Sequence, residues 1–256
     1  MIHPTAVVDR AAVLGDGVEV GAYSIIDAGV EIGTGTRIGP HVVVRGQTRI
    51  GSDNRIFQFC SIGDDPQDKK YAAEPTRLEI GDRNTIREGC TINRGTVQDL
   101  GYTRVGNDNW IMAYCHIAHD CVLGDHLVLA NNATLGGHVR LDDYAILGGF
   151  AGVHQFCSVG RPACLGMFSA VNRDVPPFVT VSGIPARPRG VNGEGMKRHG
   201  FSTEQIGLAR RAYRILFRSG LKLAEARVEL TALLEGEPAL QPLVAFLADA
   251  RRGVTR

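Results

Sequence analysis

Residues 26–51 read IDAGVEIGTGTRIGPHVVVRGQTRIG, and an aliphatic residue returns at every sixth position. This six-residue series of aliphatic residues extends from Ile2 to Ile62 and resumes over residues 80–92. After a shift of one residue it continues from Val105 to Val171. Half of the 26 aliphatic positions in this series are followed by glycine. Because six is not a multiple of the 3.6 residues in a helical turn, an amphipathic helix cannot produce the pattern.

The position two before each aliphatic residue is usually small or β-branched. Examples are Ala12, Ser24, Thr36, Thr48, Cys60, Cys115, Ala133 and Ala151. Alternation within a hexad indicates a short strand with two inward side chains, and glycine allows the tight turn to the next strand. Three strands close a triangular coil of 18 residues. The sequence therefore predicts a β-solenoid in which residues 18 apart stack about 4.8 Å from each other.

Two stretches leave the repeat, at residues 64–79 and 95–104. We expect both to be loops that project from the solenoid, and loops on a rigid scaffold commonly carry function. Beyond about residue 174, four prolines end the repeat and helical patterning follows. The sequence thus divides into a solenoid domain over residues 1–186 and a helical domain over residues 187–256.

The helical domain opens its main helix at Ser202-Thr203-Glu204-Gln205, which has the pattern of a capping box. This helix is expected to run to about residue 219, with further helices at 222–235 and 239–252. Residues 187–256 contain 13 Lys and Arg against 7 Asp and Glu, although the whole chain is close to neutral. The basic domain predicts an acidic partner or phosphate groups. Nucleic acid is disfavoured, because no nucleic-acid-binding motif is present.

Six cysteines are present without a CxxC pair, and five occupy the inward position of the repeat. That placement favours a reducing compartment over a disulfide framework. The amino-terminal residues do not resemble a signal peptide, and no window approaches 18 uninterrupted apolar residues. We therefore expect a cytoplasmic protein without a membrane span.

Four of the eight histidines lie in one region, at positions 116, 119, 138 and 154. By the 18-residue rule, His138 lies above Asp120, His154 above Ala118 and Gln155 above His119. The four histidines, Asp120 and Gln155 are therefore predicted to line one edge of the prism across three coils, within roughly 10 Å. Solvated surface imidazoles are the alternative for any one of them.

A histidine followed by an aspartate offers general-base chemistry, because the imidazole accepts a hydroxyl proton near neutral pH and a carboxylate fixes its tautomer. Adjacent residues on a strand point to opposite faces, so the pattern leaves open whether Asp120 pairs with His119. No Ser or Cys lies in a GxSxG motif, which favours direct transfer over a covalent intermediate. Three histidines could instead hold zinc in a metal-dependent hydratase.

Five segments carry a close resemblance to a known family. They are QDKKY at 67–71, NWIMAYCHIAHDC at 109–121, NNATLGGH at 131–138, VHQF at 153–156 and GVNGEGMKRHGF at 190–201. The chain resembles the UDP-N-acetylglucosamine O-acyltransferases, hexapeptide-repeat enzymes of the first step of lipid A synthesis. The resemblance covers essentially the whole chain, in order and spacing.

The resemblance implies a left-handed parallel β-helix with a carboxy-terminal helical domain. It also implies a homotrimer with active sites between adjacent prisms, and no cofactor or metal. The implied reaction moves an (R)-3-hydroxyacyl chain from acyl carrier protein to the 3-hydroxyl of UDP-N-acetylglucosamine. His119 would be the general base and Asp120 its electrostatic partner.

Further roles follow from the same resemblance. His116, His138, His154 and Gln155 would line the sugar and acyl groove, Asp68 and Lys70 would bind the nucleotide-sugar, and Asn192 and Arg198 would hold uridine and phosphate. Arg210, Arg211, Arg214 and Arg218 would contact the acidic carrier protein. An ordinary solvated helix face is the alternative for these arginines.

In the family that the chain resembles, one residue at the far end of the groove limits the length of the acyl chain and is called the hydrocarbon ruler. Met167 matches that residue. Methionine fills space that glycine would leave open, and each buried methylene is worth about 0.8 kcal/mol. We therefore predict a chain of about ten to twelve carbons, with simple groove packing by Met167 as the alternative.

Two segments depart from the family pattern, at Gly160-Arg161-Pro162 and Gly183-Ile184-Pro185-Ala186. Both departures lie where the resemblance implies contacts to the acyl-pantetheine or the base. The related N-acyltransferases have an additional amino-terminal domain, whereas the repeat begins here at residue 2. A 3-amino acceptor is not excluded by the sequence, and a non-enzymatic scaffold would leave the histidine column unexplained.

Overall fold

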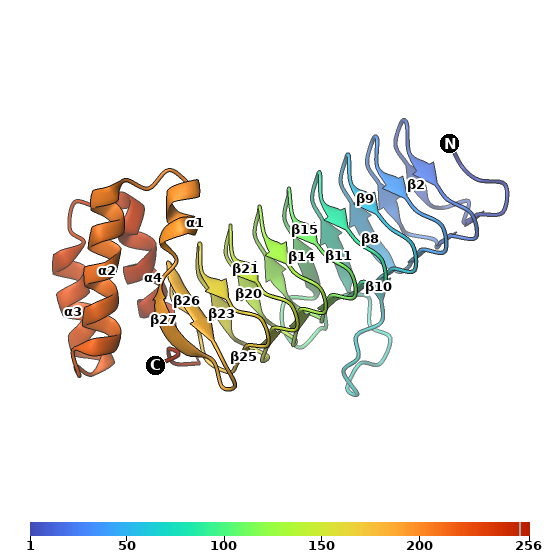
Figure 1. Cartoon of the computed structure of the whole chain (residues 1–256). Helices are drawn as coiled ribbons and strands as arrows, with labels where there is room; N and C mark the ends of the chain where they lie inside the picture. Colours follow the sequence, from blue (N-terminus) through green and yellow to red (C-terminus); the bar gives the residue numbers. More distant parts are fainter. Residues whose placement is uncertain (251) are drawn as a thin grey trace.

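Three parallel sheets form the walls of a long triangular prism in the computed structural model, which describes residues 1–250 and 252–256 (Figure 1). The first sheet contains β1 (Val7–Val8), β4 (Ile25–Ile26), β7 (Val43–Val44), β10 (Ser61–Asp64), β13 (Thr91–Asn93), β16 (His116–Ile117), β19 (Thr134–Leu135), β22 (Gly152–Val153) and β25 (Ala170–Val171). The second contains β2 (Val13–Leu14), β5 (Glu31–Ile32), β8 (Gln47–Ile50), β11 (Arg77–Ile80), β14 (Tyr102–Val105), β17 (Val122–Leu123), β20 (Arg140–Leu141) and β23 (Ser158–Val159).

The third sheet contains β3 (Glu19–Val20), β6 (Arg37–Ile38), β9 (Arg55–Ile56), β12 (Thr85–Ile86), β15 (Trp110–Ile111), β18 (Val128–Leu129), β21 (Ile146–Leu147), β24 (Cys164–Leu165), β26 (Val179–Ser182) and β27 (Arg187–Val191). Each strand from β1 to β26 pairs in parallel with the strand one coil away, as in Ile25 with Val43 and Val128 with Ile146. The 18-residue stacking is confirmed, and the fold is the expected left-handed parallel β-helix with a helical carboxy-terminal domain.

The interior of the prism contains the aliphatic series and the small residues two positions before it. Ile62, Ile117 and Leu135 are fully buried, as are Ser24 and Ala133. Five cysteines are buried and Cys164 is half-buried, and all six are free thiols. Burial raises the pKa of Cys121 to about 12, so this thiol stays protonated.

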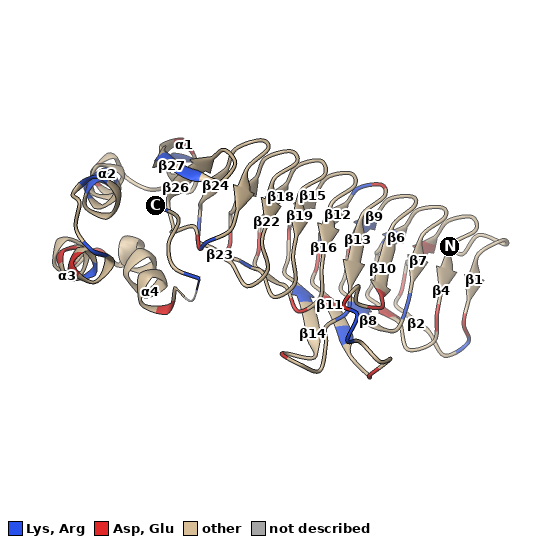
Figure 2. Ribbon diagram, turned by 90° about the horizontal axis from the view of Figure 1, so that it is seen from below, with Lys and Arg blue, Asp and Glu red and all other residues tan. Residues whose placement is uncertain are grey.

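Both projecting loops leave the edge between the first and second sheets, and they lie on the same side of the prism (Figure 2). They are shorter than expected, because residues 77–79 and 102–104 belong to β11 and β14. Leu78 and Thr103 are fully buried two positions before Ile80 and Val105. The alternation of inward and outward side chains therefore begins two residues before Ile80 and Val105. The predicted loop ends at residues 79 and 104 were wrong.

The carboxy-terminal domain contains α1 (Gly193–Arg198), α2 (Thr203–Arg218), α3 (Leu223–Leu233), the 3₁₀ turn η1 (Pro238–Leu240) and α4 (Gln241–Asp249). The capping box at Ser202 and Gln205 is confirmed by its two reciprocal hydrogen bonds, which are 3.2 and 3.0 Å long. Strand β27 pairs antiparallel with β26, so the sheet continues beyond residue 186. Among the described residues, no helix is long and apolar enough to cross a membrane.

The end of the chain returns to the last coil of the solenoid. The backbone N–H of Thr255 donates to the carbonyl of Asp174 over 2.8 Å, and the buried Asp174 carboxylate accepts from the backbone N–H of Ser158 and Arg252. The sequence pattern gave no sign of this closure, because the paired residues lie about 80 positions apart and outside the repeat.

Candidate active site

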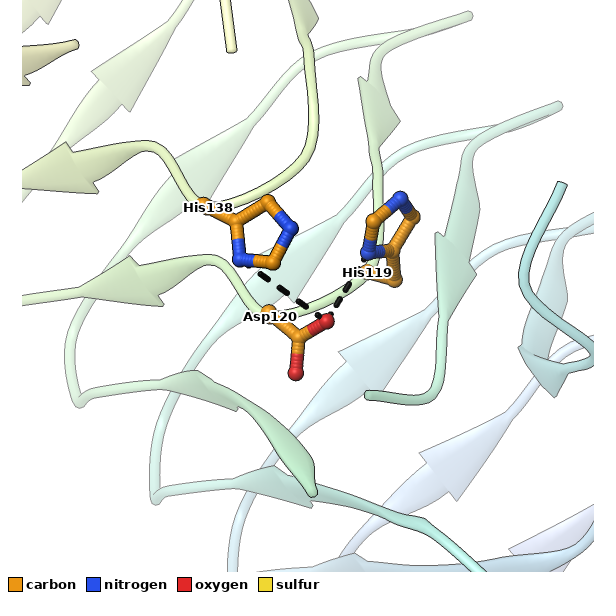
Figure 3. A group of neighbouring side chains, drawn as sticks. All are labelled: His119, Asp120 and His138. Carbon is orange, nitrogen blue, oxygen red and sulfur yellow. Dashed lines mark hydrogen bonds and ion pairs between the residues drawn. The ribbon is translucent and has the colours of Figure 1, made fainter. Parts of the chain in front are cut away.

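His119 and Asp120 face each other at the edge between the first and second sheets (Figure 3). The Nδ1 atom of His119 lies 2.8 Å from Oδ2 of Asp120. Asp120 has a positive φ of 57°, which turns the chain at this edge and breaks the strand alternation. The two neighbouring side chains can therefore pair, which answers the question that the sequence left open.

Thr96, on the second loop, fixes the Asp120 carboxylate from the other side. Its backbone N–H donates to Asp120 Oδ1 over 3.0 Å, and its hydroxyl donates to Oδ2 over 2.6 Å. The side chain of Asp120 is fully buried. Burial alone would raise the pKa of Asp120, but the hydrogen bonds from His119 and Thr96 hold it below its usual value of 3.8.

The ionised Asp120 carboxylate determines the tautomer of His119. A carboxylate only accepts hydrogen bonds, so Nδ1 of His119 carries the proton and donates to Asp120. In the neutral ring Nε2 is then an unprotonated acceptor. His119 thus has the arrangement of a general base.

The coil above His119 contributes Gly137 and His138. A Cβ atom on Gly137 would lie 2.6 Å from Cε1 of His119, so the imidazole occupies space that any other residue would fill. The His138 ring is perpendicular to His119 at 5.0 Å and stacks on Phe156 at 4.2 Å. His138 therefore lies over the His119–Asp120 pair, as the stacking of residues 18 apart predicted.

His138 makes a second imidazole–carboxylate pair. Its Nδ1 atom lies 2.7 Å from Oδ2 of Asp99, on the second loop, and 4.0 Å from Oδ2 of Asp120. The second loop thus supplies Thr96 to the Asp120 carboxylate and Asp99 to the His138 ring. The sequence predicted that this loop could carry function but did not identify Thr96 or Asp99, because loop residues have no position in the repeat.

His116 and His154 lie beside this pair rather than within it. His116 is on β16, where its Nδ1 lies 2.7 Å from the hydroxyl of Thr91. Burial, and then the charge of nearby His119, lower the pKa of His116, which keeps the ring neutral. His154 is exposed, with Nδ1 3.1 Å from the carbonyl of Gln155 and 3.4 Å from Arg252. Within the predicted column, His119, Asp120 and His138 contact one another, whereas His116 and His154 have hydrogen-bond partners outside it or next in sequence.

The proposed nucleotide-sugar residues Asp68 and Lys70 lie on the first loop. The Asp68 carboxylate accepts from the backbone N–H of Lys70 over 3.0 Å, and the Lys70 side chain is exposed. Arg94 fixes the loop by donating to the carbonyl of Gly63 over 2.7 Å, to the hydroxyl of Tyr71 over 2.9 Å and to the carboxylate of Asp65.

Asn192 is the N-cap of α1, and Arg198 is the last residue of that helix. The Asn192 amide donates to the carbonyl of Pro162 over 2.8 Å and accepts from the backbone N–H of Gly195 over 3.0 Å. One N–H and one lone pair of this amide remain for a ligand. Arg198 is exposed. The Arg161-Pro162 departure therefore lies directly against Asn192.

Met167 lies on a different edge from His119. It follows β24, where the chain turns from the third sheet to the first, and 66% of its surface is exposed. Tyr23, Phe59, Tyr114, Phe150 and Phe168 are also exposed on this edge. Met167 and His119 therefore lie at opposite borders of the first sheet. Arg210, Arg211, Arg214 and Arg218 are all exposed on α2.

His119, Asp120 and His138 have ligand atoms within 4.8 Å of one another, which is close enough for a metal ion. These atoms are, however, already engaged. Asp120 Oδ2 accepts from His119 and Thr96, and Nδ1 of His138 faces Asp99. A metal ion would have to break this network, so the donor set fits hydrogen bonding better than metal coordination.

Two family models match parts of the chain. The model described as UDP N-acetylglucosamine O-acyltransferase, domain 2, matches residues 174–255. The bacterial transferase hexapeptide model, of six repeats, matches residues 11–46 and 102–137. The first match covers the end of the solenoid and most of the helical domain, and the second covers two parts of the repeat.

Relatives and solved structures match the full length. An acyl-[acyl-carrier-protein]–UDP-N-acetylglucosamine O-acyltransferase from Thiobacillus denitrificans is 58% identical, over 100% of this chain and 99% of the relative. The Neisseria gonorrhoeae protein of the same name is 53% identical over the same shares. The structure of LpxA from Acinetobacter baumannii is 46% identical with a TM-score of 0.98, again over 100% and 99% of the two chains. The chain therefore belongs to the UDP-N-acetylglucosamine O-acyltransferase family, and it is an acyltransferase.

Proposed function

We propose that the chain transfers an (R)-3-hydroxyacyl group from acyl carrier protein to the 3-hydroxyl of UDP-N-acetylglucosamine, as the first step of lipid A synthesis. The names of the relatives support both substrates. The observation that carries the proposal is the His119–Asp120 pair, in which a buried carboxylate orients an imidazole whose Nε2 remains an acceptor. This pair lies at an edge of the prism beside two loops that can contact a substrate.

In the proposed reaction, Nε2 of His119 removes the proton of the sugar hydroxyl while the oxygen attacks the thioester carbonyl. The imidazolium that forms is stabilised by the Asp120 carboxylate. The tetrahedral intermediate then collapses, the C–S bond breaks and the thiolate leaves. Proton transfer from His119 to this sulfur gives the carrier thiol and the sugar ester, so no covalent acyl-enzyme is needed.

We propose that the active form is a homotrimer in which the edge carrying Met167 on one copy faces the edge carrying His119 on the next. The exposed aromatic residues beside Met167 support this arrangement, because large apolar side chains gathered on one edge mark an interaction surface. Met167 would then end the acyl groove of the neighbouring copy and limit the chain to about ten to twelve carbons.

Substrate contacts are proposed for three further regions. Asp68 and Lys70 would bind the nucleotide-sugar from the first loop, and His116, His138, His154 and Gln155 would line the groove. Asn192 and Arg198 would hold uridine and phosphate, and Arg210, Arg211, Arg214 and Arg218 would contact the acidic carrier. A cytoplasmic location stays a prediction, which the free buried thiols support.

The direct test is an assay with UDP-N-acetylglucosamine and 3-hydroxyacyl carrier protein thioesters, comparing the wild type with His119→Ala. We expect turnover to fall at least a hundredfold, because general bases contribute about 10²–10⁴-fold. His126→Ala is the matched control, since His126 is an exposed histidine on another edge. If His119→Ala retained most of the wild-type turnover, the proposed base would be wrong.

A further inference from the structure

The second loop holds a carboxylate against the ring of His138. Oδ2 of Asp99 lies 2.7 Å from Nδ1 of His138. Only 12% of the His138 side chain is exposed, whereas 42% of the Asp99 side chain is exposed. Because an ionised carboxylate only accepts hydrogen bonds, this contact requires a proton on Nδ1 of His138. Asp99 therefore determines the protonated nitrogen of His138, as Asp120 does for His119.

The backbone of the loop keeps Asp99 in this position. Residues 96–101 form a turn in which the carbonyl of Thr96 accepts from the backbone N–H of Asp99 over 3.4 Å and from that of Gly101 over 3.0 Å. Thr96 is itself buried, and its N–H and hydroxyl donate to the Asp120 carboxylate. The Asp99 carboxylate is thus held at His138 by a turn whose first residue is anchored on Asp120.

Asp120 does not take the place of Asp99 as the partner of His138. Its Oδ2 atom lies 4.0 Å from Nδ1 of His138, which is beyond hydrogen-bond length. The same oxygen already accepts from Nδ1 of His119 and from the hydroxyl of Thr96. Among the described residues, Asp99 is therefore the only hydrogen-bond partner of the His138 ring.

Phe156 and Asp99 together determine how the His138 ring is oriented. The rings of Phe156 and His138 stack with centroids 4.2 Å apart and an interplanar angle of 7°. Half a turn about the Cβ–Cγ bond of His138 would keep this stacking but would move Nδ1 away from the loop, so the bond to Asp99 selects one of the two orientations. Nε2 is then the free nitrogen of His138, on the side of the ring that faces His119 (Figure 3).

We propose that Asp99 is a positioning residue that acts through His138: it keeps the proton on Nδ1, so that Nε2 accepts a hydrogen bond from a second hydroxyl or an N–H group of the sugar substrate. The inference rests on the proposed function, because it takes the reacting sugar hydroxyl to lie at Nε2 of His119. The two imidazole rings are 5.0 Å apart, so a hexose whose reacting hydroxyl meets His119 has further polar groups within reach of His138.

Magic-angle-spinning NMR of the full chain, labelled with ¹³C and ¹⁵N on histidine, tests where the proton of His138 lies. At about pH 8, above the usual histidine range, we expect a protonated Nδ1 and an unprotonated Nε2. The signals are assigned by their absence from His138→Gln. In Asp99→Asn the amide can donate to Nδ1, so a protonated Nε2 should appear. A proton on Nε2 of His138 in the wild type would overturn the proposal.

Steady-state kinetics measures the consequence for the reaction. We expect Asp99→Asn to lower kcat/KM for UDP-N-acetylglucosamine about tenfold or more, because a donor group of the sugar would then face an N–H. KM for the acyl carrier protein thioester should not change. Asp16→Asn is the matched control, since Asp16 is exposed in the first coil, and it should behave like the wild type.

Two kinetic results would overturn the proposal. One is an unchanged kcat/KM for UDP-N-acetylglucosamine in Asp99→Asn. The other is an equal loss with both substrates, which would show that the loop was displaced. The other histidine signals in the NMR spectrum check that the fold is intact. Turnover of the wild type and of His119→Ala is measured in the same assay, so a failure of the proposed function would be recognised separately.

Discussion

Gly137 determines where the His119 ring can lie. The imidazole packs directly over the glycine, and a methyl group there would overlap Cε1 at 2.6 Å. The proposed general base is therefore positioned by the absence of a side chain one coil above it. Glycine is needed at position 137 for space and not for backbone conformation, because the φ of Gly137 is not among the positive values that favour glycine.

Gly137→Ala is accordingly expected to lower turnover about a hundredfold, because a displacement of about 1 Å can reduce catalysis by that factor. The fold should persist, since the ring can move outward. The measurement is kcat in the carrier-protein assay together with circular dichroism. Gly207→Ala is the control, because a Cβ there meets nothing within 4 Å. Wild-type turnover in Gly137→Ala would contradict this account.

Thr96→Val removes one hydroxyl hydrogen bond from Asp120 and leaves the backbone N–H in place. A carboxyl whose pKa is lower in the folded state stabilises the fold above its unfolded pKa and loses that contribution as pH falls through the folded value. Asp120 is such a group. We expect the variant to be less stable by about 1.5–3 kcal/mol near pH 7, with a smaller difference below about pH 3.8.

Urea unfolding of wild type and Thr96→Val between pH 3 and pH 7 measures this difference. Thr134→Val serves as the control, since Thr134 is exposed and its hydroxyl donates only to the carbonyl of Asn132. A stability difference that stayed constant over this pH range would show that the Thr96 bond does not depend on the charge of Asp120.

The sequence identified His119, Asp120 and His138 because the repeat assigns each a coil and an edge. It could not decide whether neighbours His119 and Asp120 pair, since that depends on a positive φ at Asp120. It also could not find Thr96 and Asp99. Their positions follow from how a loop folds back over the edge, and no periodic pattern encodes that path.

At the scale of elements, α2 combines a buried face with a row of exposed arginines. Ile206, Ala209, Ala212 and Leu216 are buried, whereas Arg210, Arg211 and Arg214 are exposed. The helix start was predicted correctly, because a capping box is a local signal. The strand bounds at Arg77 and Tyr102 were missed, since each strand begins with a residue that fits a loop equally well.

Reversing two charges on α2 tests its proposed role. We expect Arg210→Glu with Arg214→Glu to raise KM for the acyl carrier protein thioester at least tenfold at low salt, because like charges then face the acidic carrier. The effect should shrink as salt increases. KM for the corresponding pantetheine thioester should not change. Arg227→Glu with Lys222→Glu, on the neighbouring helix region, is the matched control, and an equal effect there would refute a specific contact surface.

At the scale of the molecule, Met167 and His119 lie on different edges of one prism. We expect Met167→Gly to extend the preferred acyl chain by two to four carbons, because each newly buried methylene contributes about 0.8 kcal/mol. Met167→Leu, which conserves volume, should keep the wild-type preference. A panel of thioesters from eight to sixteen carbons measures the shift. An unchanged preference in Met167→Gly would mean that Met167 does not end the groove.

Fold class and coil stacking could be predicted for the whole solenoid because the same physical rule acts at every coil. The boundary between the two domains was predicted at residue 186 because the six-residue repeat ends before it. The third sheet nevertheless continues to Val191, because β27 pairs antiparallel with β26. The sequence also did not predict the hydrogen bond between Asp174 and Thr255. The first contact is a hairpin closed by residues 183–186, and the second joins segments about 80 positions apart, so neither follows from the six-residue repeat.

The two ends of the prism differ in how they meet solvent. Residues 252–255 and the helices cover the last coil, whereas the inward-facing Val8 and Leu14 of the first coil are only half-buried, and no other described segment stacks on that coil from outside. In a solenoid each coil gains stability mainly from the coils it touches, so we expect fraying to begin at the coil with only one neighbour. His119 lies in the turn that follows β16, the sixth strand of the first sheet. Because five coils separate His119 from the open end, we expect those coils to unfold before the coil that carries His119 and Asp120.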